Sequence, residues 1–319
     1  MPYRADRLVR HATLRQLQVF VAIAKEGSFS KAAERLHLTQ PTVSMQVKKL
    51  SEAVGEPLFE QIGRKVYLTE VGRIMLDAAQ SILDQLALAE GKINELRGVA
   101  GGTVRLSVVS TAQYFVPEVI YDFLEEYPDV NVVMEVGNRE TLLVRIQKNV
   151  DDFYILGQPP EGLRVESHVL ANNPLAVVAH CDHPLAQKKG RIKLEALAEA
   201  PFLMRERGSG IRKQVEHVFQ QQGFEPNIKM VLGGNEAIRL GLRENLGVTV
   251  ASLPTLMDEI ESGEVVVLNV EGFPLMRHWY LAWPEGKALS LASRLLIDRL
   301  KQGGAGLDAH IDQLLSDHG

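Results

Sequence analysis

The sequence predicts an α+β domain with a winged helix-turn-helix, then a long linker helix, and then an α/β domain of two lobes. Three observations predict this order. Residues 1–69 contain short, closely spaced helices and a surplus of positive charge, residues 70–97 continue as one amphipathic helix, and residues 98–302 alternate strands with helices. A C-terminal tail is expected over 303–319.

The composition is that of a globular protein without an internal disulfide. The chain has 319 residues, of which 45% are hydrophobic and 24% charged, and its single cysteine is Cys181. No apolar run approaches the ~18 residues that span a membrane, and the first residues, MPYRADRLVRH, lack the apolar region of a signal peptide. We therefore expect a cytoplasmic protein with no membrane partner.

The net charge of −5 conceals an asymmetry along the chain. Residues 1–69 hold 11 Lys or Arg against 6 Asp or Glu, whereas residues 98–319 hold 21 against 29. A basic N-terminal part favours a polyanionic partner, although a solvated surface would show the same surplus. The order of residues within this part has to decide between the two.

Three helices are expected in the N-terminal part. The first covers 14–25 and ends at Gly27, and the second is the short run FSKAAERL after the N-cap candidate Ser28. The third follows Thr39, with Pro41 in its first turn. Its apolar stripe consists of Val43, Val47 and Leu50. Two short helices joined by a tight turn are typical of a helix-turn-helix, whose second helix enters the major groove of DNA.

The polar face of the third helix supplies the residues expected to contact DNA. Gln40 can pair with adenine, Ser44 with several bases, and Met45 can pack on a thymine methyl group. Lys48 and Lys49 would neutralise phosphates. The full expected set in the helix-turn-helix is Ser28, Gln40, Pro41, Thr42, Ser44, Met45, Lys48 and Lys49. By helix pattern alone, a plain three-helix bundle with a solvated face is an equal alternative.

A two-stranded wing is expected after the third helix. Leu58-Phe59 and Val66–Leu68 read as short strands on either side of Gly63-Arg64-Lys65. Arg64 and Lys65 would form a basic tip that reaches a neighbouring DNA backbone or minor groove. The wing favours the DNA-binding interpretation over the plain bundle.

From Leu14 to Gly72 the chain resembles the DNA-binding domain of the LysR-type transcriptional regulators. The resemblance is carried by SFSKAAERLHLTQPTVSMQVKKL and GEPLFEQIGRKVYLTEVG. Two positions depart from the family pattern, since Ser51 stands where glutamate is usual and Gln61 where arginine is frequent. The resemblance implies a regulator that binds double-stranded promoter DNA and has RNA polymerase as a candidate partner.

One uninterrupted helix is expected from Glu70 to Leu96, because no proline and only a late Gly91 occur there. About 27 residues of helix would span about 40 Å. The apolar positions follow a heptad seam with one extra residue: Val71, Met75, Ala78, Ile82, Leu86, Ala89, Ile93 and Leu96. Such a seam favours a coiled-coil partner, the alternative being packing on the helix's own domain. The LysR resemblance implies a homodimer through this helix and a homotetramer of two dimers.

The remaining chain is expected to form two lobes of strands and helices. Strands are expected at 103–109, 131–136, 153–157, 175–180, 202–204, 227–232, 248–252, 265–270 and 279–283, and helices at 115–126, 139–148, 211–222, 235–244, 254–261 and 289–301. This alternation predicts largely parallel sheets. The first lobe is expected at 103–171 and 274–302, and the second at 172–273. The LysR resemblance implies the same architecture, two Rossmann-like subdomains of periplasmic-binding-protein type.

Four loops at the carboxyl ends of these strands are expected to hold a ligand. They offer hydroxyl and amide groups at helix starts, and RERGSGIR adds three arginines, which suits a phosphate or carboxylate. The expected effector-binding residues are Ser110, Thr111, Gln113, Gln158, Arg205, Ser209, Arg212, Asn235 and Glu236. Arg205 and Arg212 would carry the charge. A single residue such as Ser110 or Asn235 has a plain alternative role as a helix cap.

Catalytic chemistry is not expected. Cys181 and His183 in HCDHP have the residue types of a nucleophile and a base, but no acid–base arrangement accompanies them. A small buried cysteine before a turn is the expectation there. We expect no catalytic residue, no metal site and no cofactor.

Within the LysR family, STAQYFVPEV, DDFYILGQPP, RERGSGIR and GGNEAIRLGLRENLGVTVAS resemble the regulators of carbon-fixation and inorganic-carbon-uptake genes. This resemblance implies that the effector is a phosphorylated sugar or a related metabolite. Ile211 departs from the subgroup, in which threonine is usual. A LysR-type regulator of nitrogen, sulfur or amino-acid metabolism is the alternative. A two-lobed enzyme or a solute-binding protein would leave the helix-turn-helix unexplained.

Overall fold

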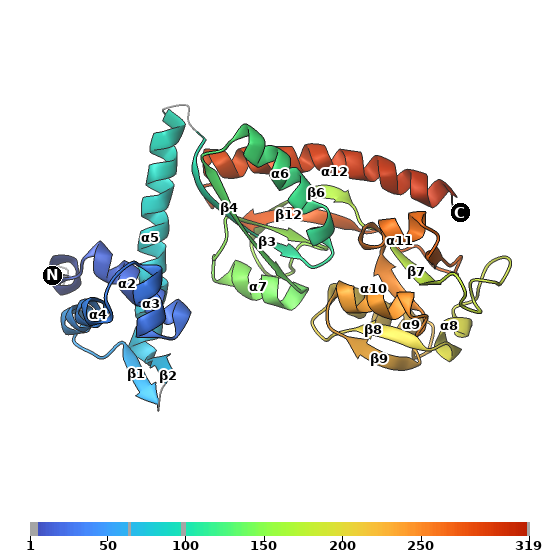
Figure 1. Ribbon diagram of the computed structural model, residues 1–319, viewed down its shortest axis with the longest axis horizontal. Coiled ribbons are helices and arrows are strands. Elements are labelled where there is room, and N and C mark those ends of the chain that lie inside the picture. The colour runs from blue at the N-terminus through green and yellow to red at the C-terminus, as the bar shows by residue number, and fades with distance from the viewer. Residues whose placement is uncertain (1–5, 63–64, 97–99, 318–319) are drawn as a thin grey trace. The chain divides into compact units, whose positions relative to one another are not determined.

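The computed structural model describes residues 6–62, 65–96 and 100–317, and the chain divides into two compact units (Figure 1). The first unit covers Met1–Ile93 and the second Asn94–Gly319. None of the described helices combines the length and the hydropathy needed to cross a bilayer.

The first unit is a helical domain with a wing, followed by a long helix. Its described elements are α1 (Asp6–His11), α2 (Leu14–Glu26), α3 (Phe29–Arg35), α4 (Gln40–Val54), β1 (Phe59–Ile62), β2 (Lys65–Leu68) and α5 (Glu70–Leu96). The two strands pair antiparallel, from Phe59 opposite Leu68 to Ile62 opposite Lys65. The predicted helix-turn-helix and wing are therefore confirmed as elements, whereas α1 was not predicted.

Local capping explains where these helices begin and end. Thr13 and Gln16 form a capping box at the start of α2, in which the Thr13 N–H donates to Gln16 Oε1 at 2.9 Å. Gly27 ends α2 at φ 60°, a left-handed conformation that glycine adopts at little cost. The apolar stripe of α4 faces the core, since Val43, Val47 and Leu50 are buried.

Helix α5 has the predicted length of 27 residues, but its apolar seam divides into two parts. Near the start of α5, Val71 and Met75 pack against the buried core of the first unit. Farther along, Ile82, Leu86 and Ile93 are 43–50% exposed in the single chain. The first part of the seam thus belongs to its own domain, and only the second part offers a surface to a partner helix.

The second unit alternates strands and helices, as predicted. Its elements are β3 (Gly102–Val109), η1 (Ala112–Tyr114), α6 (Val116–Glu126), β4 (Val130–Gly137), α7 (Arg139–Gln147), β5 (Phe153–Leu156), β6 (Val165–Asn172), β7 (Leu175–His180), α8 (Glu195–Glu199), β8 (Phe202–Arg205), α9 (Gly210–Gln221), β9 (Ile228–Leu232), α10 (Asn235–Arg243), β10 (Thr249–Ser252), η2 (Leu253–Thr255), α11 (Met257–Glu261), β11 (Val265–Val267), β12 (His278–Pro284) and α12 (Leu291–Asp317).

These elements form two lobes. The first lobe is built on the sheet β4-β3-β5-β12-β6, and the second on the sheet β10-β7-β11 together with the pair β8-β9. The chain leaves the first lobe after β6 and returns at β12. Each lobe has its own core, with Trp279 and Phe123 fully buried in the first and Phe202 and Phe219 in the second.

The prediction of largely parallel sheets is wrong in part. Strand β3 is parallel to β4 and β5, and β8 is parallel to β9. However, β12 is antiparallel to both β5 and β6, and β7 is antiparallel to β10 and β11. Strands β6 and β12 are antiparallel because the chain leaves the first lobe at the end of β6 and returns to it at the start of β12. Strand β6 itself was not predicted, because it is an edge strand in which the four consecutive residues 166–169 are exposed, so that apolar and polar residues do not alternate along it.

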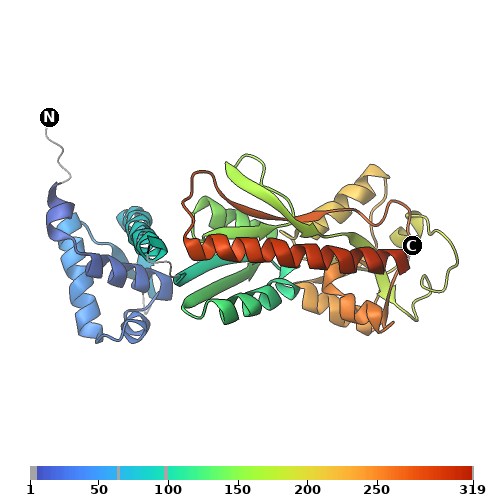
Figure 2. The same ribbon diagram turned by 90° about the horizontal axis from the view of Figure 1, so that it is seen from above.

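The expectation of a helix over 289–301 followed by a separate tail over 303–319 is also wrong. Helix α12 runs from Leu291 to Asp317 without a break. The glycines near the expected end do not stop it; Gly304 instead allows close packing, since a Cβ there would lie 2.3 Å from the Leu170 carbonyl oxygen. Figure 2 shows α12 crossing both lobes.

A pair of glycine substitutions in α12 tests this packing. Gly306→Ala meets open space and should stabilise the chain by about 0.5–1 kcal/mol through helix propensity. Gly304→Ala should instead destabilise it by about 1–3 kcal/mol, because the helix must move away from Leu170. Chemical unfolding of both variants measures the difference. Equal stabilisation by the two alanines would show that α12 does not pack on β6 in solution.

Candidate functional site

A cavity of about 430 Å³ lies between the two lobes of the second unit. The first lobe contributes the loop after β3, the start of α7 and the loop after β5. The second lobe contributes the end of β8 and the start of α9, and the chain segments that connect the lobes form another part of the wall. Polar lining residues include Ser110, Thr111, Asn138, Arg139, Gln158, Glu161, Asn173, Arg205, Ser209, Lys213, Gln214 and Arg277.

Five of the nine predicted effector residues line this cavity: Ser110, Thr111, Gln158, Arg205 and Ser209. Thr111 is positioned from the core, because its Oγ1 accepts a hydrogen bond of 3.0 Å from the buried Trp279 indole N–H. Ser209 is the N-cap residue of α9, yet its side chain makes no capping hydrogen bond. The first turn of α9 therefore presents Gly210 and Ile211 to the cavity with backbone N–H groups suited to an anion.

Arg205 lies in the cavity wall, but its charge is already neutralised. Its side chain is only 4% exposed, and it forms a two-point ion pair with Glu206, Nε–Oε2 2.8 Å and Nη2–Oε1 3.0 Å. Nη2 also donates to Ser110 Oγ of the first lobe at 3.2 Å, and Nη1 donates to Asn235 Oδ1. Arg205 thus joins the lobes and carries little unbalanced charge toward the cavity.

Glu206 is held in its ionised form by the same contacts. Burial alone would raise the pKa of Glu206, but the Arg205 guanidinium and the Gly234 N–H, which donates at 3.2 Å, together hold the pKa below its usual value. Arg205 and Glu206 therefore act as a neutral unit near pH 7.

The other four predicted residues do not line the cavity. Arg212 pairs with Glu216 at 2.7 Å and donates to the Arg205 backbone oxygen at 3.1 Å. Asn235 Nδ2 donates to the Ser110 carbonyl oxygen at 2.8 Å. Glu236 of the second lobe accepts a hydrogen bond from Tyr114 Oη of the first lobe. Gln113 is not among the residues that line the cavity. Arg212 and Asn235 therefore bind Arg205 and Ser110, which line the cavity, and Glu236 joins the two lobes.

Three cations that line the cavity were not predicted from the sequence: Arg139, Lys213 and Arg277. Arg139 donates to the Gln158 carbonyl oxygen at 2.6 Å, and burial lowers its pKa against the opposing effect of Glu161. Among the described residues, neither Lys213 nor Arg277 has an ion-pair partner. Arg277 precedes β12 on the connection between the lobes, where no helix start or glycine-rich loop draws attention to it in the sequence.

A second contact between the lobes lies beside the cavity. Tyr114 of η1 donates to Glu236 of α10, and the Arg239 guanidinium stands 5.5 Å from the Tyr114 ring centroid. Burial, followed by the neighbouring Glu236, raises the pKa of Tyr114 to about 12. The Tyr114 hydroxyl thus stays protonated and able to donate throughout the physiological range.

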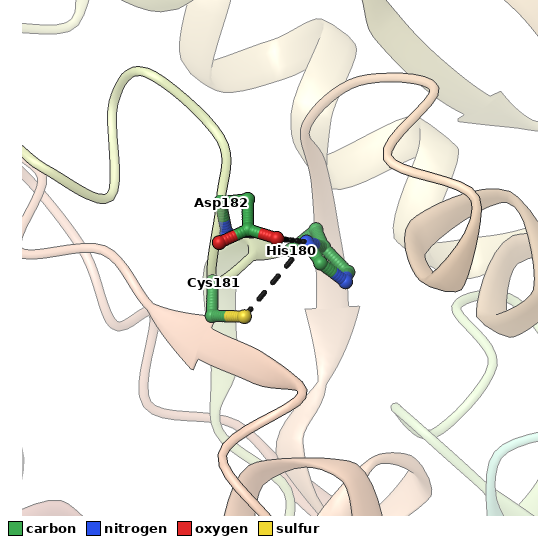
Figure 3. A group of neighbouring side chains, drawn as sticks. All are labelled: His180, Cys181 and Asp182. Carbon is green, nitrogen blue, oxygen red and sulfur yellow. Dashed lines mark hydrogen bonds and ion pairs between the residues drawn. The ribbon is translucent and has the colours of Figure 1, made fainter.

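The sequence HCDHP forms the end of β7 and the turn that follows it in the second lobe. Figure 3 shows Cys181 Sγ and the Asp182 carboxylate near Nδ1 of His180, at 3.8 Å and 3.7 Å. The Asp182 backbone N–H donates to the same Nδ1 at 3.1 Å, which occupies its lone pair. His183 instead accepts from the Leu185 N–H, and Cys181 is half-buried, less enclosed than expected.

On the first unit, the predicted DNA-contacting face of α4 is open to solvent. Gln40, Pro41, Ser44, Met45, Lys48 and Lys49 are exposed, and Thr42 and Ser28 are half-buried. Gln40 Oε1 accepts a 3.5 Å hydrogen bond from Ser30 Oγ of α3, which orients it at the start of α4. Arg64 and the side chain of Lys65 lie outside the described residues.

Known proteins share both units of the chain. Residues 14–73 match the family described as bacterial regulatory helix-turn-helix protein, lysR family, and residues 97–305 match the LysR substrate binding domain. The chain is 45% identical to a RuBisCO operon transcriptional regulator of Acidithiobacillus ferrooxidans over 92% of this chain and 94% of that protein. It is 44% identical to the HTH-type transcriptional activator CmpR of Synechocystis sp. over 92% and 96%.

The second unit is also similar to a solved structure. That structure is the CcmR regulatory domain of Synechocystis PCC6803 in complex with 2-PG, which is 38% identical to the chain. The match has a TM-score of 0.60 and covers 63% of this chain and 96% of that one.

Removing the Glu206 carboxylate tests the Arg205 ion pair. Glu206→Gln should lower the free energy of unfolding by about 1–3 kcal/mol near pH 7, because it leaves a buried guanidinium without a counter-ion. Since the pKa of Glu206 lies below 4.5 in the folded chain, its contribution is complete above about pH 4.5 and is lost as the pH falls further. The difference in the free energy of unfolding between Glu206→Gln and wild type should therefore become smaller only at acid pH.

The matched control is Glu216→Gln, which breaks an exposed pair with Arg212. We expect a change within about 0.5 kcal/mol for the control. Urea unfolding at several pH values measures both variants, and a Glu206→Gln effect as small as that of the control would contradict the buried pair.

Proposed function

The chain belongs to the LysR family of bacterial transcriptional regulators, and on that premise we propose that it controls carbon-fixation or inorganic-carbon-uptake genes in response to a small anionic metabolite. The observation that carries the proposal is the positive charge of the cavity between the lobes. Arg277 and Lys213 line it without an ion-pair partner among the described residues, beside the start of α9. An anion would complete these interactions.

The similar proteins support the proposal that the chain controls carbon-fixation or inorganic-carbon-uptake genes. Both curated relatives align along nearly the whole chain, one a RuBisCO operon regulator and the other CmpR. The structural relative CcmR carries 2-PG in its regulatory domain, so we take 2-PG as the first ligand to try on this chain.

We assign sequence reading to the start of α4. Gln40 and Ser44 are exposed there, as contact with base edges requires. The cations Lys48 and Lys49 follow them and have no ion-pair partner among the described residues. Promoter DNA is the partner that fits this face of α4. RNA polymerase is the further partner through which the bound regulator would act on transcription.

We assign dimerisation to the outer part of α5. Ile82, Leu86 and Ile93 expose an apolar stripe that a second copy of α5 would cover. A homodimer would present two copies of α4 to a two-fold operator, and two dimers would give a homotetramer.

Two substitutions separate base reading from charge neutralisation on α4. Gln40→Ala should cost about 1–3 kcal/mol at one operator base pair and flatten discrimination there. Lys48→Ala should weaken all sequences alike and lower the salt dependence of binding by about one ion. Fluorescence anisotropy against operator variants measures both. A uniform loss in Gln40→Ala would remove Gln40 from base reading.

A cavity substitution tests the effector site. Arg277→Ala should weaken 2-PG binding by about 1.5–3 kcal/mol, the range for hydrogen bonds to charged groups, and leave operator binding without effector nearly intact. Arg243→Ala is the control, because Arg243 is exposed, pairs with Glu264 and does not line the cavity. Calorimetric titration decides: no 2-PG binding to wild type would reject this ligand, and equal binding to both variants would place the anion elsewhere.

A further inference from the structure

Helix α12 is anchored in the cores of both lobes by one continuous stripe. In its first half, Leu296 and Leu300 are fully buried in the core of the first lobe. In its last turns, Ile311 is 1% and Leu314 6% exposed, and Leu314 packs in the core of the second lobe with Leu256 and Ile260. Figure 1 shows α12 running along the second unit, on the other side of the first-lobe sheet from α7.

Between these anchors, α12 holds the chain where it crosses from one lobe to the other. Asp308 Oδ1 accepts a 2.5 Å hydrogen bond from the backbone N–H of Asn172, the last residue of β6. Asn173, the next residue, lines the cavity, and its own N–H donates to the Arg277 carbonyl oxygen at 2.7 Å. The helix thus contacts one of the two connecting segments directly beside the residues that form the cavity wall.

The last turns add a polar contact to the second lobe. His310 Nε2 lies 2.7 Å from Glu261 Oε1 at the end of α11. Both side chains are about half exposed, so the apolar contact of Leu314 and the hydrogen bond of Asp308 carry the attachment. The LysR substrate binding domain matches only as far as residue 305, so this attachment lies beyond the part shared with that family model.

We propose that residues 306–317 of α12 act as a strap that holds the second lobe in the arrangement enclosing the cavity. The inference stands apart from the proposed function, since it concerns the motion of the lobes and not the identity of the ligand. A helix anchored in two lobes resists their rotation, because rotation must either bend the helix or detach its last turns. The strap therefore favours the enclosed cavity over an open one, even without a ligand.

A consequence follows for effector binding and rests on the proposed function. If the enclosed form is the one that binds a ligand, the apparent affinity is proportional to its population. Releasing the strap lowers that population and weakens binding without touching a cavity residue. Adjusting the strap would thus set the metabolite concentration at which the regulator responds.

The experiment measures the distance between the lobes directly. In a Cys181→Ser background, spin labels go on Val144→Cys of α7 and Leu240→Cys of α10, two side chains that are 45% and 59% exposed. Doubly labelled chains are mixed with an excess of unlabelled chains, so that an oligomer carries one labelled chain, and pulsed electron spin resonance then gives the distance distribution between the two labels of that full chain without ligand. The test variants are Leu314→Ala and Asp308→Ala, and the control is Gln313→Ala on the exposed side of α12.

We expect one narrow distribution for wild type and Gln313→Ala, and a broader or two-peaked one for Leu314→Ala and Asp308→Ala. Narrow, unchanged distributions in both test variants would overturn the proposal. Circular dichroism checks folding; should Leu314→Ala unfold the second lobe, Asp308→Ala decides, because it leaves both cores intact.

The same variants are titrated with 2-PG. About three- to thirtyfold weaker binding in the test variants, with wild-type affinity in Gln313→Ala, supports the link between strap and effector. Altered distances with unaltered 2-PG affinity would overturn that link alone. Because the distance measurement needs no ligand, a failure of 2-PG to bind wild type would reject the proposed effector and leave the strap to the distance data.

Discussion

Arg205 joins the two lobes at the wall of the cavity, and both the shape and the charge of the cavity depend on how this buried guanidinium is satisfied. A charge that is 4% exposed requires a counter-ion and hydrogen-bond acceptors close by. Glu206 supplies the counter-ion, while Ser110 of the first lobe and Asn235 of the second supply acceptors. The resulting contacts bring the loop after β3 against the loops after β8 and β9, and the cavity lies beside them.

Because Arg205 is neutralised in this way, the proposed recognition of an anion rests on other groups. Arg277 stands on the connection between the lobes, Arg139 at the start of α7 and Lys213 in the first turn of α9. These cations come from the two lobes and from the segment that joins them, so a ligand held by all three is sensitive to the angle between the lobes. Helix α12 restrains that same angle from outside the cavity. Ligand binding and the last turns of α12 therefore act on one motion.

The sequence predicted those features that depend on local signals. Capping residues and apolar spacing located α2, α3 and α4, and the absence of proline between Glu70 and Leu96 predicted the length of α5. The loops after β3, β5 and β8 were located because parallel strands end at one edge of a sheet. Features that depend on contacts between residues far apart in the sequence were not predicted. Strand β6 lacks the alternation of apolar and polar residues by which a strand is recognised, and Gly304 resembles a helix end until Leu170 is seen beside it. Arg277 gave no signal, since its position follows from the path of the chain between lobes, and Arg212 points along α9 toward Glu216.

A regulator that acts as proposed must couple occupation of the cavity to binding of DNA through the chain. Thermodynamic linkage makes this coupling measurable, because a ligand that changes operator affinity must have its own affinity changed by operator DNA by the same factor. The direct measurement is calorimetric titration of 2-PG into the free protein and into the protein saturated with operator DNA. We expect two different affinities, whose ratio equals the change in operator affinity that 2-PG causes. The same 2-PG affinity in both states, with the cavity intact, would contradict the coupling.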